Sequence, residues 1–393
     1  MPNQDWKAAT RLIHEGGQRS AFGETSEALY LTQGFVYDSA EAAQARFAGE
    51  EEGYVYSRYA NPTVTVFEER MCALEGAERA LATASGMAAV TAALMCQVKA
   101  GDHVVASRAL FGSCRWVIEK LMPQYGVETT LVDGSDLDSW KSAVRPNTVA
   151  MFLESPTNPT LELVDIRAVA DLAHDNGSKL IVDNVFATPI YQKPLELGAD
   201  VVVYSATKHI DGQGRCLGGV ILSDNDWIEE TLFDYYRHTG PSLSPFNAWV
   251  LLKGLETLTL RVEHQTRSAA QIATFLDGRD EVKRISYPGL ASHPQAELAA
   301  QQMSSGSTLV AFELADKQKA FEFENALELV RISNNLGDAK SLITHPATTT
   351  HKNLSSEDRD ALGISDGMLR LSVGLEHCDD LINDIERALG QLG

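Results

Sequence analysis

A lysine follows an apolar run in the segment DVVVYSATKHIDGQGRCLGG, residues 200–219. The run ends at Ser205, and Lys208 stands just beyond it, ahead of a glycine-rich turn and a second apolar run. A lysine that a buried strand delivers into a crevice is partly desolvated, which lowers the pKa of its amine and makes it a nucleophile toward carbonyl groups. An ordinary surface lysine is the alternative, and this segment alone does not exclude it.

An aspartate stands at a comparable place earlier in the chain. Asp183 ends the apolar run of KLIVDNVFATP. A carboxylate there could simply cap the next helix. In open α/β sheets, however, ligands bind outside the carboxyl ends of the strands, so Asp183 and Lys208 should face one crevice. An acidic partner for a pyridinium nitrogen and a lysine for an aldehyde are what pyridoxal phosphate requires.

Five spaced motifs strengthen that reading: YSRYANPT from Tyr56, ESPTNP from Glu154, VDN from Val182, SATK followed by GQG, and RLSVGLEH from Arg370. Together they resemble the Cys/Met-metabolism family of pyridoxal-phosphate enzymes, nearly from end to end. This family includes cystathionine synthases and lyases, homoserine-ester sulfhydrylases and methionine γ-lyase. The resemblance implies an α/β fold of the aspartate-aminotransferase-like type (fold type I), with a mostly parallel sheet and a smaller C-terminal α+β domain.

The resemblance also implies roles for the matching residues. Lys208 would bind the cofactor aldehyde and shuttle protons, while Asp183 would keep the ring nitrogen protonated. Asn158 would approach the phenolic oxygen of the cofactor, although Asn before Pro159 also suits a plain turn. Glu154 is interpreted as structural support.

A phosphate site is expected from four further residues. Ser205 and Thr207, with the backbone at Gly86 and Met87, resemble the phosphate cup of the family. The segment ASGMAAV also reads as a turn that opens a helix, whose free N–H groups and dipole favour an anion.

Tyr56 and Arg58 lie far from the predicted sheet in the sequence. In the family this pair reaches the phosphate of a neighbouring subunit, so the resemblance implies a shared site and a homotetramer built as a dimer of dimers. Taken alone, Arg58 would be a solvated surface charge.

Two arginines are candidates for the substrate. Arg370 resembles the arginine that binds the substrate α-carboxylate, for which a planar guanidinium suits bidentate contact. Arg115 is a candidate for a second carboxylate, with a surface residue as the equal alternative.

The segment LFGSC departs from the family pattern. Phe111 stands where a tyrosine usually stacks on the cofactor, and a phenylalanine can stack but cannot exchange a proton. Methionine γ-lyases place a cysteine where this chain has Ser113, with Cys114 one residue later.

The implied reaction is γ-replacement on O-succinylhomoserine with sulfide, giving homocysteine and succinate for methionine biosynthesis. Cystathionine γ-synthesis with cysteine and γ-elimination remain open. A non-catalytic relative that keeps the fold as a binding or assembly module is the alternative of another class.

Composition limits the partners. With 33 Lys and Arg against 54 Asp and Glu, the net charge of −21 argues against nucleic acid and an anionic membrane surface. The five cysteines are scattered and form no C-x-x-C pair, so we expect neither a disulfide framework nor a metal site.

The amino terminus lacks a secretory h-region, which favours the cytoplasm. The uncharged run 80–98 is rich in Ala and is expected to be strand, turn and helix rather than a membrane span.

The apolar runs predict a doubly wound sheet in residues 61–254, preceded by an extended arm over residues 1–60 with a helix near 40–48. The predicted strands are 80–84, 103–106, 128–132, 149–153, 180–182, 201–204 and 219–222, with a helix over 166–176 among them. Residues 226–261 look helical, and a long helix over 251–275 leads into the smaller domain, 255–393. There we expect strands at 307–313, 330–333 and 369–373 and a last helix at 379–392.

The glycine-rich run at Gly212, Gly214, Gly218 and Gly219 leads into a strand rather than a helix, which disfavours dinucleotide binding. His209 either tunes the site or packs beside Lys208. We assign no catalytic role to His345 or His351.

Overall fold

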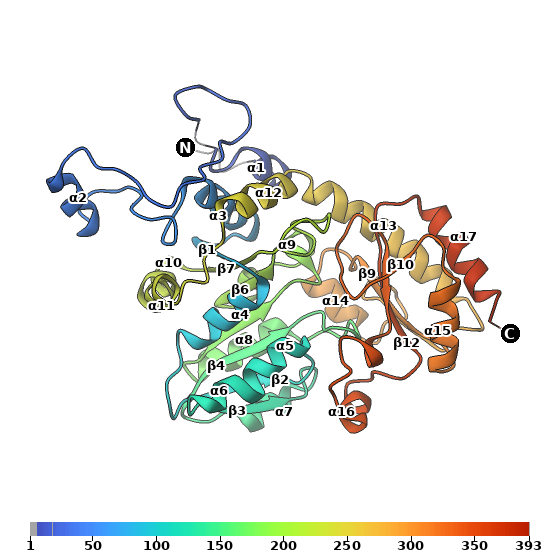
Figure 1. The fold of residues 1–393 in the computed structure, drawn as a ribbon. Helices are drawn as coiled ribbons and strands as arrows, with labels where there is room; N and C mark the ends of the chain where they lie inside the picture. The colour runs from blue at the N-terminus through green and yellow to red at the C-terminus, as the bar shows by residue number, and fades with distance from the viewer. Residues whose placement is uncertain (1–5, 18, 393) are drawn as a thin grey trace.

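The computed structural model describes residues 6–17 and 19–392. Figure 1 shows two sheets with packed helices and an extended N-terminal segment that leaves the body of the molecule. Residues 1–5 and 18 of the expected arm lie outside the described residues.

The N-terminal segment contains two short helices, α1 (Ala8–His14) and α2 (Ala40–Phe47). The Ser39 side chain caps α2 by accepting a hydrogen bond from the Ala42 N–H, as the sequence led us to expect for a helix near residues 40–48. No residue of α2 is buried, and Phe22 and Val36 are 94% and 93% exposed. Helix α1 was not predicted from the sequence.

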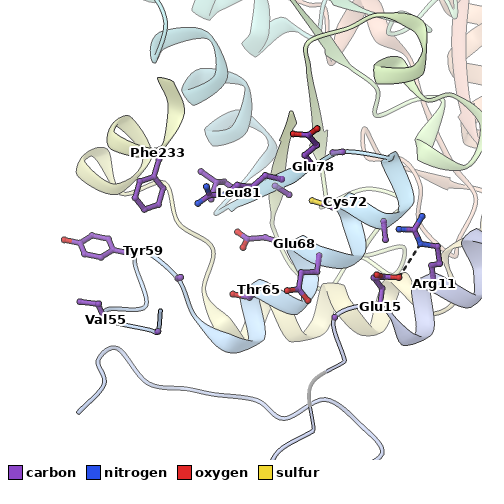
Figure 2. Close-up of a pocket in the computed structure, with 18 residues that line it drawn as sticks. Arg11, Glu15, Val55, Tyr59, Thr65, Glu68, Cys72, Glu78, Leu81 and Phe233 are labelled. Carbon is purple, nitrogen blue, oxygen red and sulfur yellow. Dashed lines mark hydrogen bonds and ion pairs between the residues drawn. The ribbon is translucent and has the colours of Figure 1, made fainter. Parts of the chain in front are cut away.

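A cavity of about 750 Å³ lies where this segment passes α3 (Pro62–Glu75). Figure 2 shows Glu15, Glu68 and Glu78 along its wall, with Arg11 paired to Glu15. Burial raises the pKa of Glu68 to about 8. Four glutamates and two arginines line the cavity, and Glu68 is mainly protonated at neutral pH.

Seven strands of the described residues form the larger sheet, in the order β1-β7-β6-β5-β4-β2-β3. They are β1 (Arg79–Thr83), β2 (His103–Ser107), β3 (Glu128–Val132), β4 (Thr148–Glu154), β5 (Lys179–Asp183), β6 (Val201–Ser205) and β7 (Gly219–Ser223). Only β7 runs antiparallel to its neighbours among these strands. Each strand matches an apolar run of the sequence.

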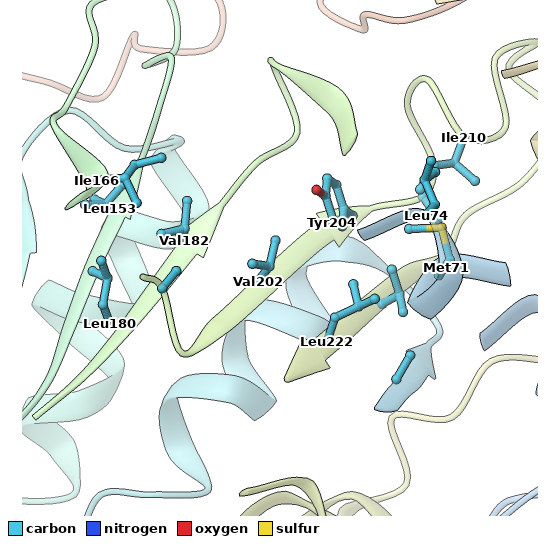
Figure 3. Close-up of a cluster of buried hydrophobic side chains, with 14 of the residues drawn as sticks. Met71, Leu74, Leu153, Ile166, Leu180, Val182, Val202, Tyr204, Ile210 and Leu222 are labelled. Carbon is cyan, nitrogen blue, oxygen red and sulfur yellow. The ribbon is translucent and has the colours of Figure 1, made fainter. Parts of the chain in front are cut away.

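Consecutive apolar residues occur in these strands because helices cover both faces of the sheet. Val202 and Tyr204 of β6 pack with Met71 and Leu74 of α3, as Figure 3 shows. Val203 points to the other face and packs beneath α4 (Gly86–Met95). The strand ends that face the site are thereby fixed from both sides.

The helices between the strands are short. They are α5 (Gly112–Trp116), α6 (Met122–Gln124), α7 (Leu137–Ala143), α8 (Ile166–Asp175) and α9 (Thr188–Tyr191). The Asp165 side chain caps α8 on the Ala168 N–H, at the start of the helix predicted over 166–176. The run 80–98 forms β1 and α4, and no helix in the described part of the chain is long and apolar enough to cross a membrane.

The stretch 226–261, predicted to be helical, is divided into separate helices, and the long helix predicted over 251–275 begins later, at Leu258. The structure has α10 (Asn225–Trp227), α11 (Phe233–Thr239), α12 (Pro245–Leu255) and α13 (Leu258–Asp277). Gly240 ends α11 with a φ of 76°, a conformation that glycine adopts readily, and Ser244 with Pro245 opens α12. The boundary proposed near Gly254 falls in the last turn of α12 and stays a prediction.

A second sheet follows α13, with the strand order β10-β11-β12-β9-β8. Its strands are β8 (Arg284–Ser286), β9 (Leu309–Glu313), β10 (Arg331–Ile332), β11 (Leu342–Thr344) and β12 (Met368–Ser372), and its helices are α14 (Ala296–Gln302), α15 (Lys317–Ala326), α16 (Ser356–Ala361) and α17 (Cys378–Leu389). The sequence predicted β9, β10, β12 and α17. It missed β8 and β11, which have three residues each.

A buried ionic cluster fixes the N-terminal segment to the body. Glu27 bonds to Arg70 of α3 and to Lys253 of α12, and the Arg70 side chain is fully buried. Arg70 also donates to the backbone carbonyls of Ile13 and Glu15. Burial alone would raise the pKa of Glu27, but its hydrogen bonds to Lys253 and Arg70 outweigh that effect and lower it to about 2.

We predict that Glu27→Gln destabilises the chain by about 1.5–3 kcal/mol, because Arg70 and Lys253 lose the carboxylate that they share, while Glu256 still pairs with both. Glu52→Gln, an exposed glutamate of the same segment, is the control. Since the folded-state pKa of Glu27 is depressed, its contribution should be complete above pH 4.5 and disappear as the pH falls toward 2. Thermal denaturation across that range measures both effects, and equal midpoints for the variant and the wild type would contradict the prediction.

Candidate active site

The carboxyl ends of β4, β5 and β6 border a cavity of about 270 Å³. Ten of the residues given a role from the sequence line it: Gly86, Met87, Phe111, Glu154, Asn158, Asp183, Ser205, Thr207, Lys208 and Arg370. The larger cavity near α3 has no comparable set of groups, so we take the smaller one as the candidate site.

Lys208 lies in the turn after β6. Its Nζ donates a hydrogen bond to Asn335 Oδ1 at 2.5 Å. Burial, assisted by the positive charge of Arg370 and opposed by Asp183, lowers the pKa of Lys208 to about 8. The amine is therefore neutral in a substantial fraction of molecules near neutral pH, as the sequence led us to expect.

Asp183 is the last residue of β5 and is 8% exposed. Burial raises its pKa to about 6, while the Val185 N–H and the Lys208 charge act in the opposite direction. The carboxyl is thus mainly ionised at neutral pH. A fixed negative charge inside the cavity suits a cationic ring nitrogen.

The residues expected to form a phosphate site lie around the start of α4. The Ser85 side chain caps this helix on the Ala88 N–H, and the first N–H groups that follow have no partner within the helix. A Cβ on Gly86 would lie 2.5 Å from Ser205 Cβ, so only glycine lets the end of β6 come this close. Helix N–H groups beside the Ser205 and Thr207 hydroxyls form a set of donors that fits a phosphate.

Arg370 reaches the cavity from β12 of the second sheet and is 1% exposed. Its Nη1 donates to Asn158 Oδ1 at 2.7 Å and its Nη2 to the Asn334 carbonyl at 3.0 Å, whereas its Nε has no partner among the described residues. Burial lowers its pKa to about 10, so the guanidinium remains charged. A buried cation with an unpaired N–H is a suitable partner for a carboxylate.

Phe111 forms part of the wall and is 37% exposed. Its backbone N–H donates to Glu154 Oε2 at 2.9 Å. Burial and the nearby Asp183 raise the pKa of Glu154 well above its ordinary value. Glu154 therefore fixes the segment that carries Phe111, which agrees with a supporting role.

Tyr56 and Arg58 lie outside this cavity. The Arg58 guanidinium donates to the Arg237 carbonyl and lies 4.8 Å from the ring centroid of Tyr59 and 5.4 Å from that of Tyr56. The structure of one chain thus does not bring this pair to its own candidate site.

Arg115 also lies outside the lining residues. Its Nη2 bonds to Glu119 at 3.0 Å and to Asp358 of α16 at 3.3 Å, and these carboxylates raise its pKa although burial alone would lower it. The interpretation of Arg115 as an available cation for the substrate does not fit this geometry, because two anions already hold its guanidinium.

Sequence reasoning missed Asn335, which contacts Lys208, and Asn334, which contacts Arg370. Both precede LGD between β10 and β11, and the paired asparagines were the only available signal. It also gave no role to Cys114, whose buried thiol lines the wall with its sulfur 3.8 Å from that of Met87. His209 packs as a buried neutral ring, since burial lowers its pKa to about 3.

Comparison with known proteins agrees with this geometry. The model of the Cys/Met metabolism PLP-dependent enzymes matches residues 9–390. The chain belongs to this family. It is 56% identical over 386 residues to an O-succinylhomoserine sulfhydrylase of Mycobacterium tuberculosis (97% of this chain and 95% of the relative), and 48% identical over 402 residues to one of Pseudomonas aeruginosa (99% and 100%).

A solved family structure from Campylobacter jejuni, described as an O-acetylhomoserine (thiol)-lyase, superimposes with a TM-score of 0.95 at 33% identity and covers 98% of this chain and 100% of its own. That protein carries N'-pyridoxyl-lysine-5'-monophosphate. The expected fold and the dependence on pyridoxal phosphate are therefore confirmed. In this chain, the cavity offers a desolvated amine, a fixed carboxylate and the N-terminus of a helix. These groups fit the aldehyde, the ring nitrogen and the phosphate of that cofactor.

We predict that the Lys208 amine of the cofactor-free protein reacts with acetic anhydride in a profile centred near pH 8, followed by mass spectrometry of its peptide. Asp183→Asn should move the midpoint lower, because the aspartate charge favours the ammonium form. The profile of Lys99, whose side chain is 84% exposed, serves as the control and should be the same in both proteins. A Lys208 midpoint at its ordinary 10.5 would contradict the description of a desolvated amine.

Proposed function

We propose that this enzyme catalyses γ-replacement on O-succinylhomoserine with sulfide and releases homocysteine and succinate. The observation that carries the proposal is that the Lys208 amine and the buried Arg370 guanidinium line the same cavity. The chain is also 56% identical to a protein named O-succinylhomoserine sulfhydrylase. The Cγ–O bond of the ester breaks and a Cγ–S bond forms, so the reaction needs no oxidant or reductant.

The bound cofactor supplies an electron sink for charge that develops on the substrate carbons. Arg370 binds the α-carboxylate through its unpaired Nε and thereby orients Cα. Lys208 Nζ removes the Cα proton and moves protons in the later steps. Phe111 holds the ring by stacking and exchanges no proton, so Lys208 is the general base of the proposal.

Asp183 keeps the ring nitrogen protonated, and Ser205, Thr207, Gly86 and Met87 hold the phosphate. Asn158 would face the phenolic oxygen, and its Oδ1 also fixes Arg370. These assignments rest on where the side chains lie in the cavity and on the family motifs that they match.

Two other reactions use the same groups. Cystathionine γ-synthesis would accept cysteine in place of sulfide, and γ-elimination would need no thiol. Ser113 rather than cysteine after Gly112 supports replacement over elimination. A non-catalytic binding protein is disfavoured by the intact set of Lys208, Asp183 and Arg370.

We also propose that the active unit is shared between subunits, in a homotetramer built as a dimer of dimers. Helix α2 is exposed, and so are the side chains of Phe22 and Val36 earlier in the same segment. A second copy of the chain would cover this apolar surface. Tyr56 and Arg58, which lie outside their own cavity, would then complete the phosphate site of the neighbour.

The five free cysteines are consistent with a cytoplasmic location.

We predict that Lys208→Ala loses both the yellow colour of the loaded protein and the formation of homocysteine. Lys99→Ala, at an exposed site, should retain both. Products are analysed with sulfide, with cysteine and without a nucleophile, each in the presence of O-succinylhomoserine. Activity of Lys208→Ala, or faster formation of cystathionine or of a 2-oxo acid by the wild type, would contradict the proposal.

For the shared site, we predict complementation between two inactive variants. Arg58→Ala and Lys208→Ala subunits, unfolded and refolded together in equal amounts, form mixed dimers in which one site has both defects and the other has none. About a quarter of the wild-type activity should return, whereas each variant alone stays inactive. Failure of the mixture to regain activity, with mixed dimers demonstrated by mass, would contradict a shared site.

A further inference from the structure

A second buried arginine contacts the chain directly after Lys208. Arg261 lies in the first turn of α13 and is 6% exposed. Its Nη1 donates to the His209 carbonyl at 2.8 Å, and its Nη2 donates to the Ile210 carbonyl at 3.3 Å and to the Gly254 carbonyl at 2.8 Å. Burial lowers its pKa to about 10, so this guanidinium is charged at neutral pH.

The turn after Lys208 is shaped around this guanidinium. Gly212 has a φ of +65°, and a Cβ there would lie 1.9 Å from Arg261 Nη1. Asp211 closes the same turn by accepting hydrogen bonds from the Arg215 N–H at 2.7 Å and from Arg215 Nε at 2.9 Å. Within the glycine-rich run, Gly212 therefore makes room for Arg261.

The second sheet holds the opposite side of the turn. The His209 ring bonds through Nε2 to Thr308 Oγ1 at 2.7 Å, just before β9. A Cβ on Gly337 would lie 2.7 Å from the His209 backbone nitrogen, which shows how closely the loop before β11 packs here. Arg261 on one side and Thr308 with the Gly337 loop on the other therefore hold the backbone of this turn together.

We propose that Arg261 is a positioning residue for Lys208: by holding the carbonyls of His209 and Ile210, it sets the place of the lysine amine in the cavity. This inference rests on the proposed role of Lys208. A neutral side chain in its place leaves three buried carbonyls without their donor. A lysine has one ammonium group with three N–H donors and lacks the planar guanidinium, so it cannot reach the carbonyls of His209, Ile210 and Gly254 at the same time. A displacement of the amine by 1 Å is enough to reduce catalysis on the order of 100-fold.

The experiment compares Arg261→Lys, Arg261→Met and the wild type, with Arg267→Met as the control on an exposed position of the same helix. Three quantities are measured: the melting temperature of the cofactor-free protein, the rate at which visible absorbance appears after addition of pyridoxal phosphate, and kcat and KM for O-succinylhomoserine with sulfide. We expect Arg261→Lys to melt close to the wild type yet load the cofactor more slowly and lose 10- to 100-fold in kcat, with a smaller change in KM. Arg261→Met should lose more, and Arg267→Met should match the wild type.

Loading rate and kcat equal to the wild type in Arg261→Lys would overturn the inference. So would losses in both arginine variants that disappear when the data are corrected for the unfolded fraction, because that result describes stability alone. Failure of the proposed function is distinguishable: the wild type would then load the cofactor but form no homocysteine from sulfide, and the loading rates would still test Arg261.

Discussion

Opposite charges buried in one crevice are the constraint on which the rest of the structure depends. Asp183 ends β5 and Lys208 follows the adjacent parallel strand β6, so the sheet alone brings them to the same edge. Burial penalises the charged form of each group, and each partner offsets part of that cost for the other. The result is an amine that is reactive near neutral pH beside a carboxylate that remains ionised.

The second sheet and its loops supply the remaining side chains of the candidate site. Arg370 comes from β12, and Asn335 reaches Lys208 from the loop between β10 and β11. The same loop supplies the Asn334 carbonyl to Arg370, so one short segment contacts both cations of the site. Because the amine and the carboxylate-binding guanidinium belong to different sheets, their separation depends on how the sheets pack, and α13 with Arg261 lies at that contact.

Sequence reasoning predicted the parts of the site that follow from strand order. Asp183 and Lys208 could be placed because an apolar run precedes each, and the helix start at Gly86 could be placed because a serine and a glycine open an alanine-rich segment. Asn335 could not, since β10 and β11 are too short to give a periodic signal. The ion pair of Arg115 with Asp358 was equally inaccessible, because Asp358 lies 243 residues away in the chain, whereas the pair with Glu119 has the i,i+4 spacing that a sequence can show. The break at Gly240 was missed although Gly240, Pro241 and Pro245 are residues that interrupt helices.

The most direct test of the central claim is borohydride reduction of the wild-type protein loaded with pyridoxal phosphate, followed by peptide mass analysis. The account predicts a single pyridoxyl group, attached to the peptide that contains Lys208. A pyridoxyl group on a different lysine, or none on any peptide, would contradict it.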